Sequence, residues 1–419
     1  MSIDLKKIVA QNRSGDPVAL PSFCTANAYV LRDITRFAAE NELPALIEAT
    51  CNQVNQFGGY TGQKPADYAS ALRKMADDAG MSSGYLILGG DHLGPNPWRH
   101  LPADEAMDHA KVLVKDYVEA GFTKIHLDAS MTCGGEPTPS FELVARRSAE
   151  LCVVAEEYAP DASALSYVIG TEVPVPGGES DDMSGIQVTT PDRLADTIET
   201  HRVAFGTAGV PQGIEKAIAV VVQPGVDFSH EDVFHYNRAK AADLTQAIQS
   251  YDDIAFEAHS TDYQSTGNLS HLVTDHSVIL KVGPELTFRF REGVMALDQI
   301  EAALNVPVPA AIKNTILRAM AEEPAEWANY YQGSDEHVEF LKIYSLSDRI
   351  RYYWDRPPVS SAFEHLVANL TSVGVTAAMA SQYGATFPVE QAKVLPNELI
   401  SPRIETTIAR YYRAGRWIQ

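Results

Sequence analysis

The sequence predicts an α/β protein, a (β/α)8 TIM barrel followed by a C-terminal α-helical domain. Between residue 17 and about residue 305, apolar runs of strand length alternate with amphipathic segments of helix length, and eight such pairs are present. This alternation is typical of parallel strands joined by helices, and eight pairs in roughly 290 residues match the size of one barrel. After residue 305 only helical patterns continue. We therefore expect a barrel that carries the active site over 1–305 and a helical domain over 306–419.

Each predicted strand is a short apolar run bounded by turn residues or by a polar loop. In chain order the runs cover 18–23, 43–49, 86–90, 124–128, 164–169, 217–222, 254–257 and 278–281. Helical spacing of apolar residues predicts helices up to 40, over 65–79, 104–120, 141–158, 191–205 and 239–249, and up to 304, and then over 309–320, 361–370 and 404–412. The alternative, a doubly wound open sheet, is less favoured because no Gly-x-Gly-x-x-Gly follows the first strand.

Charge and composition restrict the class of partner. The formal net charge is −22, which disfavours nucleic acid and anionic membranes. No signal peptide and no apolar run of membrane-spanning length is evident, so we expect a cytoplasmic protein. The four cysteines are far apart and fit no zinc-finger spacing, as expected for reduced thiols.

Most of the unusual polar residues follow the predicted strands, and a barrel gathers such residues around one mouth. Asp91 and His92 are the clearest case, because they come directly after a buried run that ends in two glycines. The others are Glu48, Asn52, Gln53, Asn55, Asn96, His126, Asp128, Glu172, Gln223, Glu257, His259, Thr261 and Asp262. Two histidines and a carboxylate from three different strands would form a divalent-metal site. The alternative is that these histidines and carboxylates only cap strands and begin turns.

A phosphate in a barrel often binds at the loops after the seventh and eighth strands, near a helix N-terminus. In this chain Gly283 follows the eighth strand and would let an anion approach the backbone closely. These loops contain no arginine, so we expect a cation from the helical domain, Arg349 or Arg351. The alternative is that both arginines belong to a surface ion-pair cluster. The residues that we expect to contact a substrate are Glu48, Asn52, Asn55, Ser260, Thr261, Asp262, Gly283, Arg349 and Arg351.

Seven segments along the chain resemble the tagatose-bisphosphate aldolase Z-subunit family (GatZ/KbaZ-like). They are 48–62 (EATCNQVNQFGGYTG), 89–95 (GGDHLGP), 124–130 (KIHLDAS), 170–178 (GTEVPVPGG), 257–263 (EAHSTDY), 280–284 (LKVGP) and 344–354 (YSLSDRIRYYW). The resemblance implies a barrel with a C-terminal helical domain, a cytoplasmic setting, and a role in galactitol or tagatose catabolism. Members are described as non-catalytic aldolase partners, as tagatose-6-phosphate kinases and as ketohexose epimerases. The sequence contains no P-loop, which argues against the kinase description.

A more distant resemblance is to the class II zinc-dependent ketose-bisphosphate aldolases, whose third strand ends in Asp-His. By this resemblance Asp91 is the acid/base, His92 and His259 are zinc ligands, and Glu172 matches a later glutamate. Gln223 departs from the pattern, because it stands where those aldolases have a further zinc histidine. We expect the metal ligands His92, Glu172, Gln223 and His259, and the catalytic residues Asp91, Asp128 and Glu172.

Two functions fit the resemblance. The first is a metal-dependent 4-epimerase that interconverts tagatose 6-phosphate and fructose 6-phosphate by retro-aldol and aldol steps. Its metal would be zinc, with manganese, cobalt or nickel as alternatives. The second is a non-catalytic stabilising subunit of a class II tagatose-1,6-bisphosphate aldolase. The corresponding partners are a ketose phosphate or a catalytic aldolase subunit, and a homo-oligomer is compatible with both.

Overall fold

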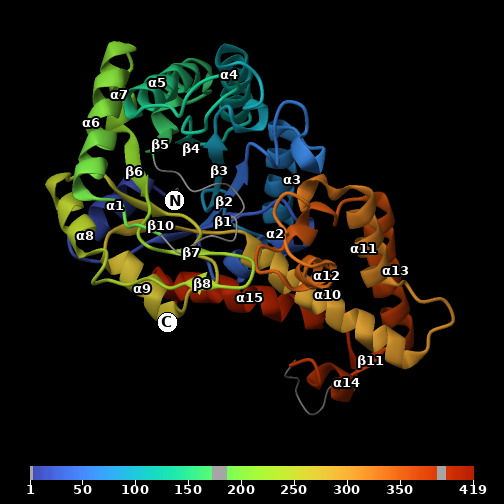
Figure 1. Ribbon diagram of the computed structural model, residues 1–419. Helices are drawn as coiled ribbons and strands as arrows, with labels where there is room; N and C mark the ends of the chain where they lie inside the picture. Colours follow the sequence, from blue (N-terminus) through green and yellow to red (C-terminus); the bar gives the residue numbers. More distant parts are fainter. Residues whose placement is uncertain (1–2, 172–185, 385–392) are drawn as a thin grey trace.

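The barrel predicted from the sequence is present in the computed structural model, which describes residues 3–171, 186–384 and 393–419. Its strands are β1 (Leu20–Cys24), β2 (Ala45–Thr50), β3 (Leu86–Leu93), β4 (Lys124–Leu127), β5 (Ser166–Ile169), β6 (Ala217–Val222), β9 (Ala255–Ala258) and β10 (Ser277–Val282). They close in the order β1-β10-β9-β6-β5-β4-β3-β2, and every neighbouring pair is parallel (Figure 1). All carboxyl ends of the strands therefore meet at one mouth.

Amphipathic helices surround the barrel. They are α2 (Ala28–Glu40), α3 (Pro65–Asp78), α4 (Ala103–Glu119), α5 (Phe141–Tyr158), α6 (Pro191–Thr207), α8 (Ala242–Ala247), α9 (Thr266–Thr274) and α10 (Pro284–Leu304). Their starts follow the usual capping chemistry: the Asn27 side chain accepts from two backbone N–H groups of α2, and α3, α6 and α10 each begin with proline. Helix α9 completes the eight strand–helix pairs, although the apolar spacing gave no helix bounds between the seventh and eighth strands.

An N-terminal helix, α1 (Leu5–Arg13), closes the other end of the barrel. Its buried face, formed by Leu5, Ile8 and Val9, packs in one apolar cluster with inward-facing strand residues such as Leu46 and Ile279. This end is therefore filled with apolar side chains. The polar chemistry of the barrel interior is confined to the opposite, carboxyl end of the strands.

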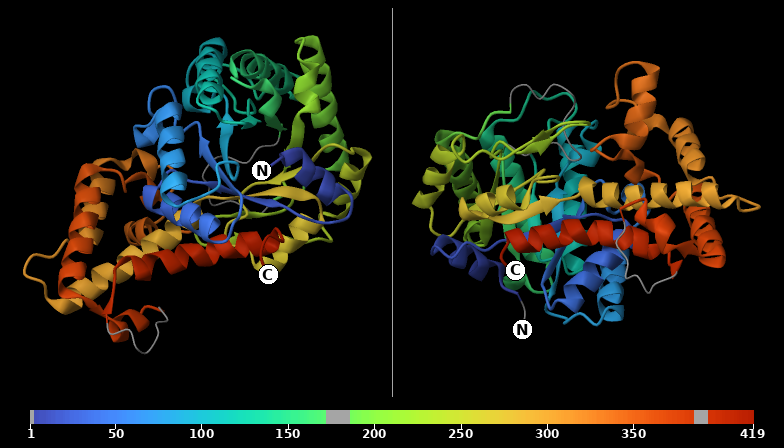
Figure 2. Two further views of the ribbon diagram at one scale, coloured as in Figure 1. Left: turned by 180° about the vertical axis from the view of Figure 1, so that it is seen from behind. Right: turned by 90° about the horizontal axis from the view of Figure 1, so that it is seen from below.

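The chain after α10 is helical, as predicted. It contains α11 (Ile312–Glu322), α12 (Asp335–Tyr344), the 3-10 turn η6 (Arg349–Tyr352), α13 (Pro357–Val373), α14 (Ala377–Ser381) and α15 (Asn397–Ala414). Helix α15 runs back beside α10 and contacts α2 and α9, so the end of the chain lies against the barrel (Figure 2). The division at residue 305 remains a prediction.

Short elements complete the described chain. They are helix α7 (Pro211–Glu215), the hairpin β7–β8 (Asp227–Phe228, Val233–Phe234), the antiparallel pair β11 and β12 (Val375–Thr376, Lys393–Val394), and the 3-10 turns η1 (Gly59–Thr61), η2 (Asn96–Trp98), η3 (Ala162–Ala164), η4 (Ile248–Ser250) and η5 (Pro324–Glu326). No helix within the described ranges has the length and apolar character needed to cross a membrane.

Candidate active site

A layer of charged side chains lies inside the barrel near its carboxyl end. Glu48 on β2, Gly89 on β3 and Lys124 on β4 are lateral neighbours in the strand register. Because Gly89 has no side chain, the Glu48 carboxylate can cross β3; a Cβ at Gly89 would lie 2.6 Å from Glu48 Cγ and Oε1. The Lys124 ammonium lies 2.7 Å from Glu48 Oε1 and 2.7 Å from Glu257 Oε2. All three charged groups are fully buried.

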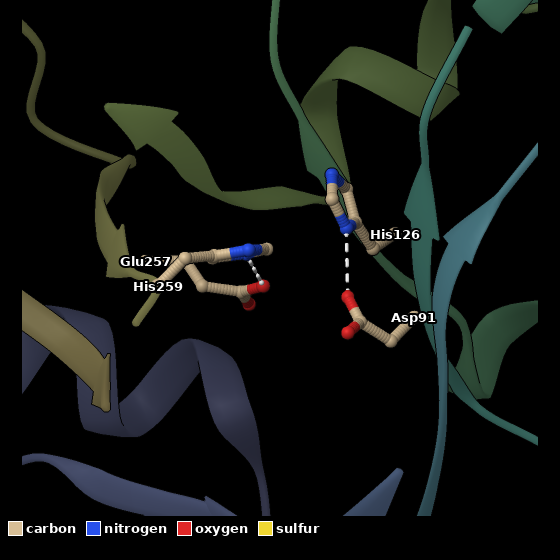
Figure 3. Close-up of side chains that lie close together, drawn as sticks. All are labelled: Asp91, His126, Glu257 and His259. Atoms are coloured by element: carbon tan, nitrogen blue, oxygen red, sulfur yellow. Dashed lines mark hydrogen bonds and ion pairs between the residues drawn. The ribbon is translucent and has the colours of Figure 1, made fainter. Parts of the chain in front are cut away.

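Four side chains, among them Glu257 of this layer, converge on one point. Single ligand atoms of Asp91, His126, Glu257 and His259 all lie within 4.8 Å of one another, and all four residues are buried. His126 Nδ1 lies 2.9 Å from Asp91 Oδ1, and His259 Nε2 lies 2.8 Å from Glu257 Oε1. Figure 3 shows these two pairs facing each other, with His126 and Asp91 from β4 and β3 and the other two from β9 and the residue after it. We call these four residues the metal cluster.

Lys281 on β10 joins the metal cluster to the charged layer. Its Nζ lies 2.7 Å from Asp91 Oδ1 and 3.8 Å from Glu257 Oε1, and it also pairs with Glu48. Burial opposes the charge of Lys281, but Asp91, Glu48 and Glu257 raise its pKa well above the usual range. The group therefore stays an ammonium ion and cannot act as the free amine of a Schiff-base enzyme.

The two carboxylates of the metal cluster are held in their ionised form. Burial alone would raise the pKa of Asp91, but His92 and Lys281 lower that pKa well below its usual range. Burial likewise opposes the charge of Glu257, and Lys124 with Lys281 lowers the pKa of Glu257 well below normal. Burial is also the main reason that the pKa of His259 falls to about 3. His259 is therefore neutral at physiological pH, which is the form that binds metal ions.

His92 lies beside the metal cluster. Its ring centroid is 5.0 Å from that of His126 and 5.1 Å from that of His259, and its Nδ1 lies 2.7 Å from Asp128 Oδ2. A carboxylate on one imidazole nitrogen that leaves the other nitrogen facing a site is the usual arrangement around a metal-binding histidine. The backbone of His92 has φ 49°, a left-handed conformation that is strained for a residue other than glycine. Asp128 thus positions His92 and does not itself belong to the metal cluster.

The residues present fit a divalent cation. The metal cluster offers two imidazoles and two carboxylates, the donor types that zinc and manganese accept. The buried Nε2 of His126 has no hydrogen-bond partner within the described chain. Burial lowers the pKa of His92, but Asp91 and Asp128 raise it above its usual value. The four carboxylates Asp91, Glu48, Glu257 and Asp128 then face three cations, Lys124, Lys281 and His92, so one uncompensated negative charge remains. Two imidazoles and two carboxylates beside an excess of negative charge are an arrangement that a cation would satisfy.

A pocket opens onto the metal cluster at the mouth of the barrel. Asp91, His92, His259 and Lys281 form its floor, and Cys24 lies beside them with Sγ 3.5 Å from Asp91 Oδ2. The remaining wall comes from the strand-end loops and, through Arg351, Tyr352 and Asp355, from the helical segment. The pocket therefore joins the barrel chemistry to side chains from beyond residue 305.

The structure brings together only part of the predicted site. The predicted residues that line the pocket are Asp91, His92, Asn52, His259, Ser260, Asp262, Gly283 and Arg351. Glu48 lies beneath the pocket in the charged layer, and the Asn55 side chain bonds to the backbone of its own loop. Thr261 Oγ1 donates to the carbonyl of Lys281. Glu172 lies outside the described residues.

Two predicted residues point elsewhere. Gln223, expected as a metal ligand, accepts through Oε1 from the N–H groups of Gly225 and Val226 and so bonds to its own loop. The Arg349 guanidinium donates to the carbonyl of Glu326 and stacks 3.3 Å above the ring of Tyr330. These contacts tie Gln223 and Arg349 to their immediate surroundings instead of to the pocket.

Lys124 and Lys281 were not among the site residues predicted from the sequence, and His126 and Glu257 were not predicted as ligands. The sequence did contain a signal for these four residues, because residues two apart on a strand point to the same face. Lys124, His126 and Asp128 occupy alternate positions along β4 and its continuation. Glu257 and His259 do the same along β9 and its continuation. Following the alternate, inward-facing positions along each strand would have identified these residues.

Comparisons with known proteins identify the family of the chain. A family model described as D-tagatose-1,6-bisphosphate aldolase subunit GatZ/KbaZ-like matches residues 5–416. The crystal structure of a probable tagatose 6 phosphate kinase from Sinorhizobium meliloti 1021 is similar with a TM-score of 0.86 and 40% identity, covering 94% of this chain and 100% of that chain.

Two aldolase structures are more distant. Fructose-bisphosphate aldolase (Fba) from Campylobacter jejuni has a TM-score of 0.48 and 13% identity, covering 89% of this chain and 94% of that one. The YdjI aldolase from Escherichia coli K12 has a TM-score of 0.44 and 13% identity, covering 87% and 96%. Likeness at this level does not bear on the reaction. From the family match over almost its whole length, the chain belongs to the GatZ/KbaZ-like family of D-tagatose-1,6-bisphosphate aldolase subunits.

Proposed function

We propose that the chain is a divalent-metal-dependent 4-epimerase that interconverts tagatose 6-phosphate and fructose 6-phosphate. The observation that carries the proposal is the metal cluster at the floor of a pocket. The ionised Asp91 belongs to the metal cluster and also lines the pocket. Family membership supports a role in tagatose phosphate chemistry. Asp91, His126, Glu257 and His259 would hold the ion, and His92 would stand next to it.

The chemistry follows from the position of the inverted carbon. C4 of a 2-ketose lies β to the carbonyl, so its hydrogen is not acidic, and inversion requires that the C3–C4 bond break and re-form. Asp91 accepts the O4 proton, the C4–O4 unit becomes an aldehyde, and the bonding electron pair stays on C3 as an enediolate. The aldehyde turns, C3 attacks its opposite face, and Asp91 returns the proton. A bound divalent ion would polarise the C2 carbonyl and stabilise the charge on its oxygen.

The two oxygens of Asp91 are suited to different tasks. Oδ1 lies against His126 and Lys281, which fix the carboxylate, whereas Oδ2 lies 3.5 Å from Cys24 Sγ at the pocket wall. The Oδ2 side can therefore exchange a proton with substrate while Oδ1 stays anchored. The low pKa of Asp91 keeps the carboxylate ionised at neutral pH, the only form that can accept a proton, and also makes it a weak base.

The test uses purified protein that is stripped with EDTA and reloaded separately with zinc, manganese, cobalt or nickel. Each sample is incubated with tagatose 6-phosphate, and the ketose phosphates are separated by chromatography. Formation of fructose 6-phosphate, lost in an Asp91→Asn variant whose metal content is measured in parallel, is the expected result. Absence of turnover in either direction with every metal would refute the proposal.

A second candidate is a non-catalytic stabilising subunit of a class II tagatose-1,6-bisphosphate aldolase. The family description as an aldolase subunit favours it, as does Gln223, which stands at an expected ligand position but bonds to its own loop. In that case the chain should co-elute with a catalytic aldolase subunit in gel filtration and extend the lifetime of that subunit's activity. Phosphoryl transfer is not proposed, because the sequence contains no P-loop.

A further inference from the structure

The helix terminus where barrels often bind phosphate is already filled in this protein. Asp262 Oδ1 accepts hydrogen bonds from the backbone N–H groups of Gly283, at 3.0 Å, and Glu285, at 2.8 Å. Pro284, between them, has no N–H. The next N–H, that of Leu286, donates to the carbonyl of Gly283. The start of α10 thus offers no free backbone donor to the pocket.

The two carboxyl groups at this terminus are also unfavourable to an anion. Asp262 is 2% exposed and lines the pocket, and Glu285, in the first turn of α10, is fully buried. Glu285 pairs with Arg410 on α15 and accepts from the N–H of Tyr263, so its charge is anchored at this place. A phosphate here would meet two carboxyl groups where an anion site requires unoccupied donors.

Only two lysine or arginine side chains line the pocket among the described residues, Lys281 and Arg351. The remaining residues, 1–2, 172–185 and 385–392, contain no lysine or arginine at all. Lys281 is surrounded by the carboxylates of Asp91, Glu48 and Glu257. Arg351 forms no ion pair with a carboxylate within the described part of the chain and is therefore the one cation at the pocket that a substrate anion can pair with.

Hydrogen bonds hold the Arg351 side chain in place at the pocket. One terminal nitrogen donates to the backbone carbonyls of Ser347 and Asp348, and the other donates to the Tyr352 hydroxyl at 2.7 Å. The Tyr352 ring is fixed in turn by an edge contact with Tyr60, at 4.7 Å between centroids. A guanidinium has five N–H donors, so at least two remain without a partner among the described residues. Two free donors on one planar group suit a phosphate oxygen pair.

We infer that the pocket selects ketoses with a single anionic end, which Arg351 binds, and that Asp262 excludes the second phosphate of a ketose 1,6-bisphosphate. The inference rests on the proposed function in taking the ligand to be a ketose phosphate. It goes further because it distinguishes monophosphate from bisphosphate, and it assigns opposite roles to two residues from different parts of the chain.

The test measures binding without turnover. Hexitol, hexitol 6-phosphate and hexitol 1,6-bisphosphate have no carbonyl and cannot enter the retro-aldol step, so isothermal titration reports affinity alone. The metal-loaded full chain should bind the monophosphate at least tenfold more tightly than hexitol, with no further gain for the bisphosphate. Arg351→Met should remove the monophosphate preference, and Arg351→Lys, which retains the charge, should keep part of it.

Variants at two other positions complete the design. Asp262→Ser frees the N–H groups of Gly283 and Glu285 and should make the bisphosphate bind at least tenfold more tightly than the monophosphate. Asp262→Asn keeps an oxygen on both N–H groups and should gain less. Arg349→Met is the matched arginine control, because Arg349 stacks on Tyr330, and it should leave the phosphate preference unchanged.

The outcomes separate this inference from the proposed function. Tenfold tighter binding of the bisphosphate than of the monophosphate by the unmodified protein would overturn the inference, as would a full monophosphate preference in Arg351→Met. Failure of turnover with the predicted binding pattern intact would refute only the epimerase. Turnover with the wrong binding pattern would refute only the assignment of Arg351 and Asp262.

Discussion

Lys124 allows the sharpest test of the charged layer. Its side chain is fully buried, and its ammonium lies 2.7 Å from carboxylate oxygens of both Glu48 and Glu257. Lys124→Met keeps a side chain of similar length but removes the charge. Lys281, at 3.8 Å, is then the nearest lysine to Glu257, which keeps its 2.8 Å hydrogen bond to the neutral His259. The site holds two uncompensated negative charges instead of one.

The expected cost follows from breaking a buried ion pair, which lowers the free energy of unfolding by about 3–5 kcal/mol. An unfolding entropy of about 2.1 cal/mol/K per residue gives roughly 0.9 kcal/mol/K for the 419-residue chain. The variant's Tm, measured in EDTA, should therefore fall by about 3–6 °C. A divalent ion should then raise the Tm of the variant more than that of the unmodified protein, because it neutralises the larger excess charge.

Thermal unfolding in EDTA and in excess zinc or manganese measures both effects. Lys216→Met is the matched control, because Lys216 forms a 2.7 Å pair with Glu156 away from the metal cluster. It should lower the Tm without changing the rise caused by metal. An EDTA Tm for Lys124→Met within about 1 °C of the unmodified protein would contradict the assigned electrostatics. So would a metal-induced rise no larger than that of the unmodified protein.

Three further outcomes are expected. His126→Ala and His259→Ala should each abolish the binding of one divalent ion per chain, measured by elemental analysis, whereas His201→Ala, a buried histidine elsewhere, should retain it. Burial raises the pKa of Asp262 to about 7. The hydrogen bond from the Glu285 backbone N–H lowers this pKa, and the nearby Glu285 carboxylate raises it further. Because folding then takes up a proton, the free energy of unfolding should decline as the pH rises from about 4 to 7, and Asp262→Asn should flatten that decline in pH-dependent melting curves. Gly89→Ala should push the Glu48 carboxylate away from Lys124 and lower the Tm and the metal affinity together. Gly209→Ala places its Cβ in open space and strains only a turn, so it should lower the Tm alone.

The barrel strands were predictable because each is a short apolar run with turn residues or a polar loop beside it. The prediction of 217–222 coincides with β6, and the other strand limits differ by a few residues. Helix α9 was missed although Ser265 caps it by accepting from Asn268 N–H. Its sequence contains Gly267 and several β-branched residues, which weaken the helical pattern. The start of α15 was missed because Pro402, inside that helix, suggests a boundary.

The site was less predictable than the fold. Sequence order shows which residues end the strands, so Asp91 and His259 could be chosen. It does not show which of the other polar side chains turn inward, and that depends on strand tilt, register and neighbouring volume. Gln223 occupies a strand end but bonds to its own loop, whereas His126, one strand along from Asp91, turns toward it. Arg349 and Arg351 are two residues apart, and only the folded η6 turn places the second at the pocket.

The charged layer also bears on the choice between catalyst and scaffold. Glu48, Lys124 and Glu257 are fully buried, and each buried charge costs several kcal/mol before its ion pairs offset part of that cost. Replacing such an ionic group by apolar side chains of similar volume is often neutral or stabilising, so a chain that only had to support a partner would be at least as stable with an apolar layer. The ionic layer instead gives the barrel mouth an excess negative charge, an orphaned imidazole nitrogen and an anchored, ionised Asp91. These properties favour cation binding and proton transfer, and none of them contributes to holding another subunit. The physical chemistry of the layer therefore supports a catalyst over a non-catalytic subunit.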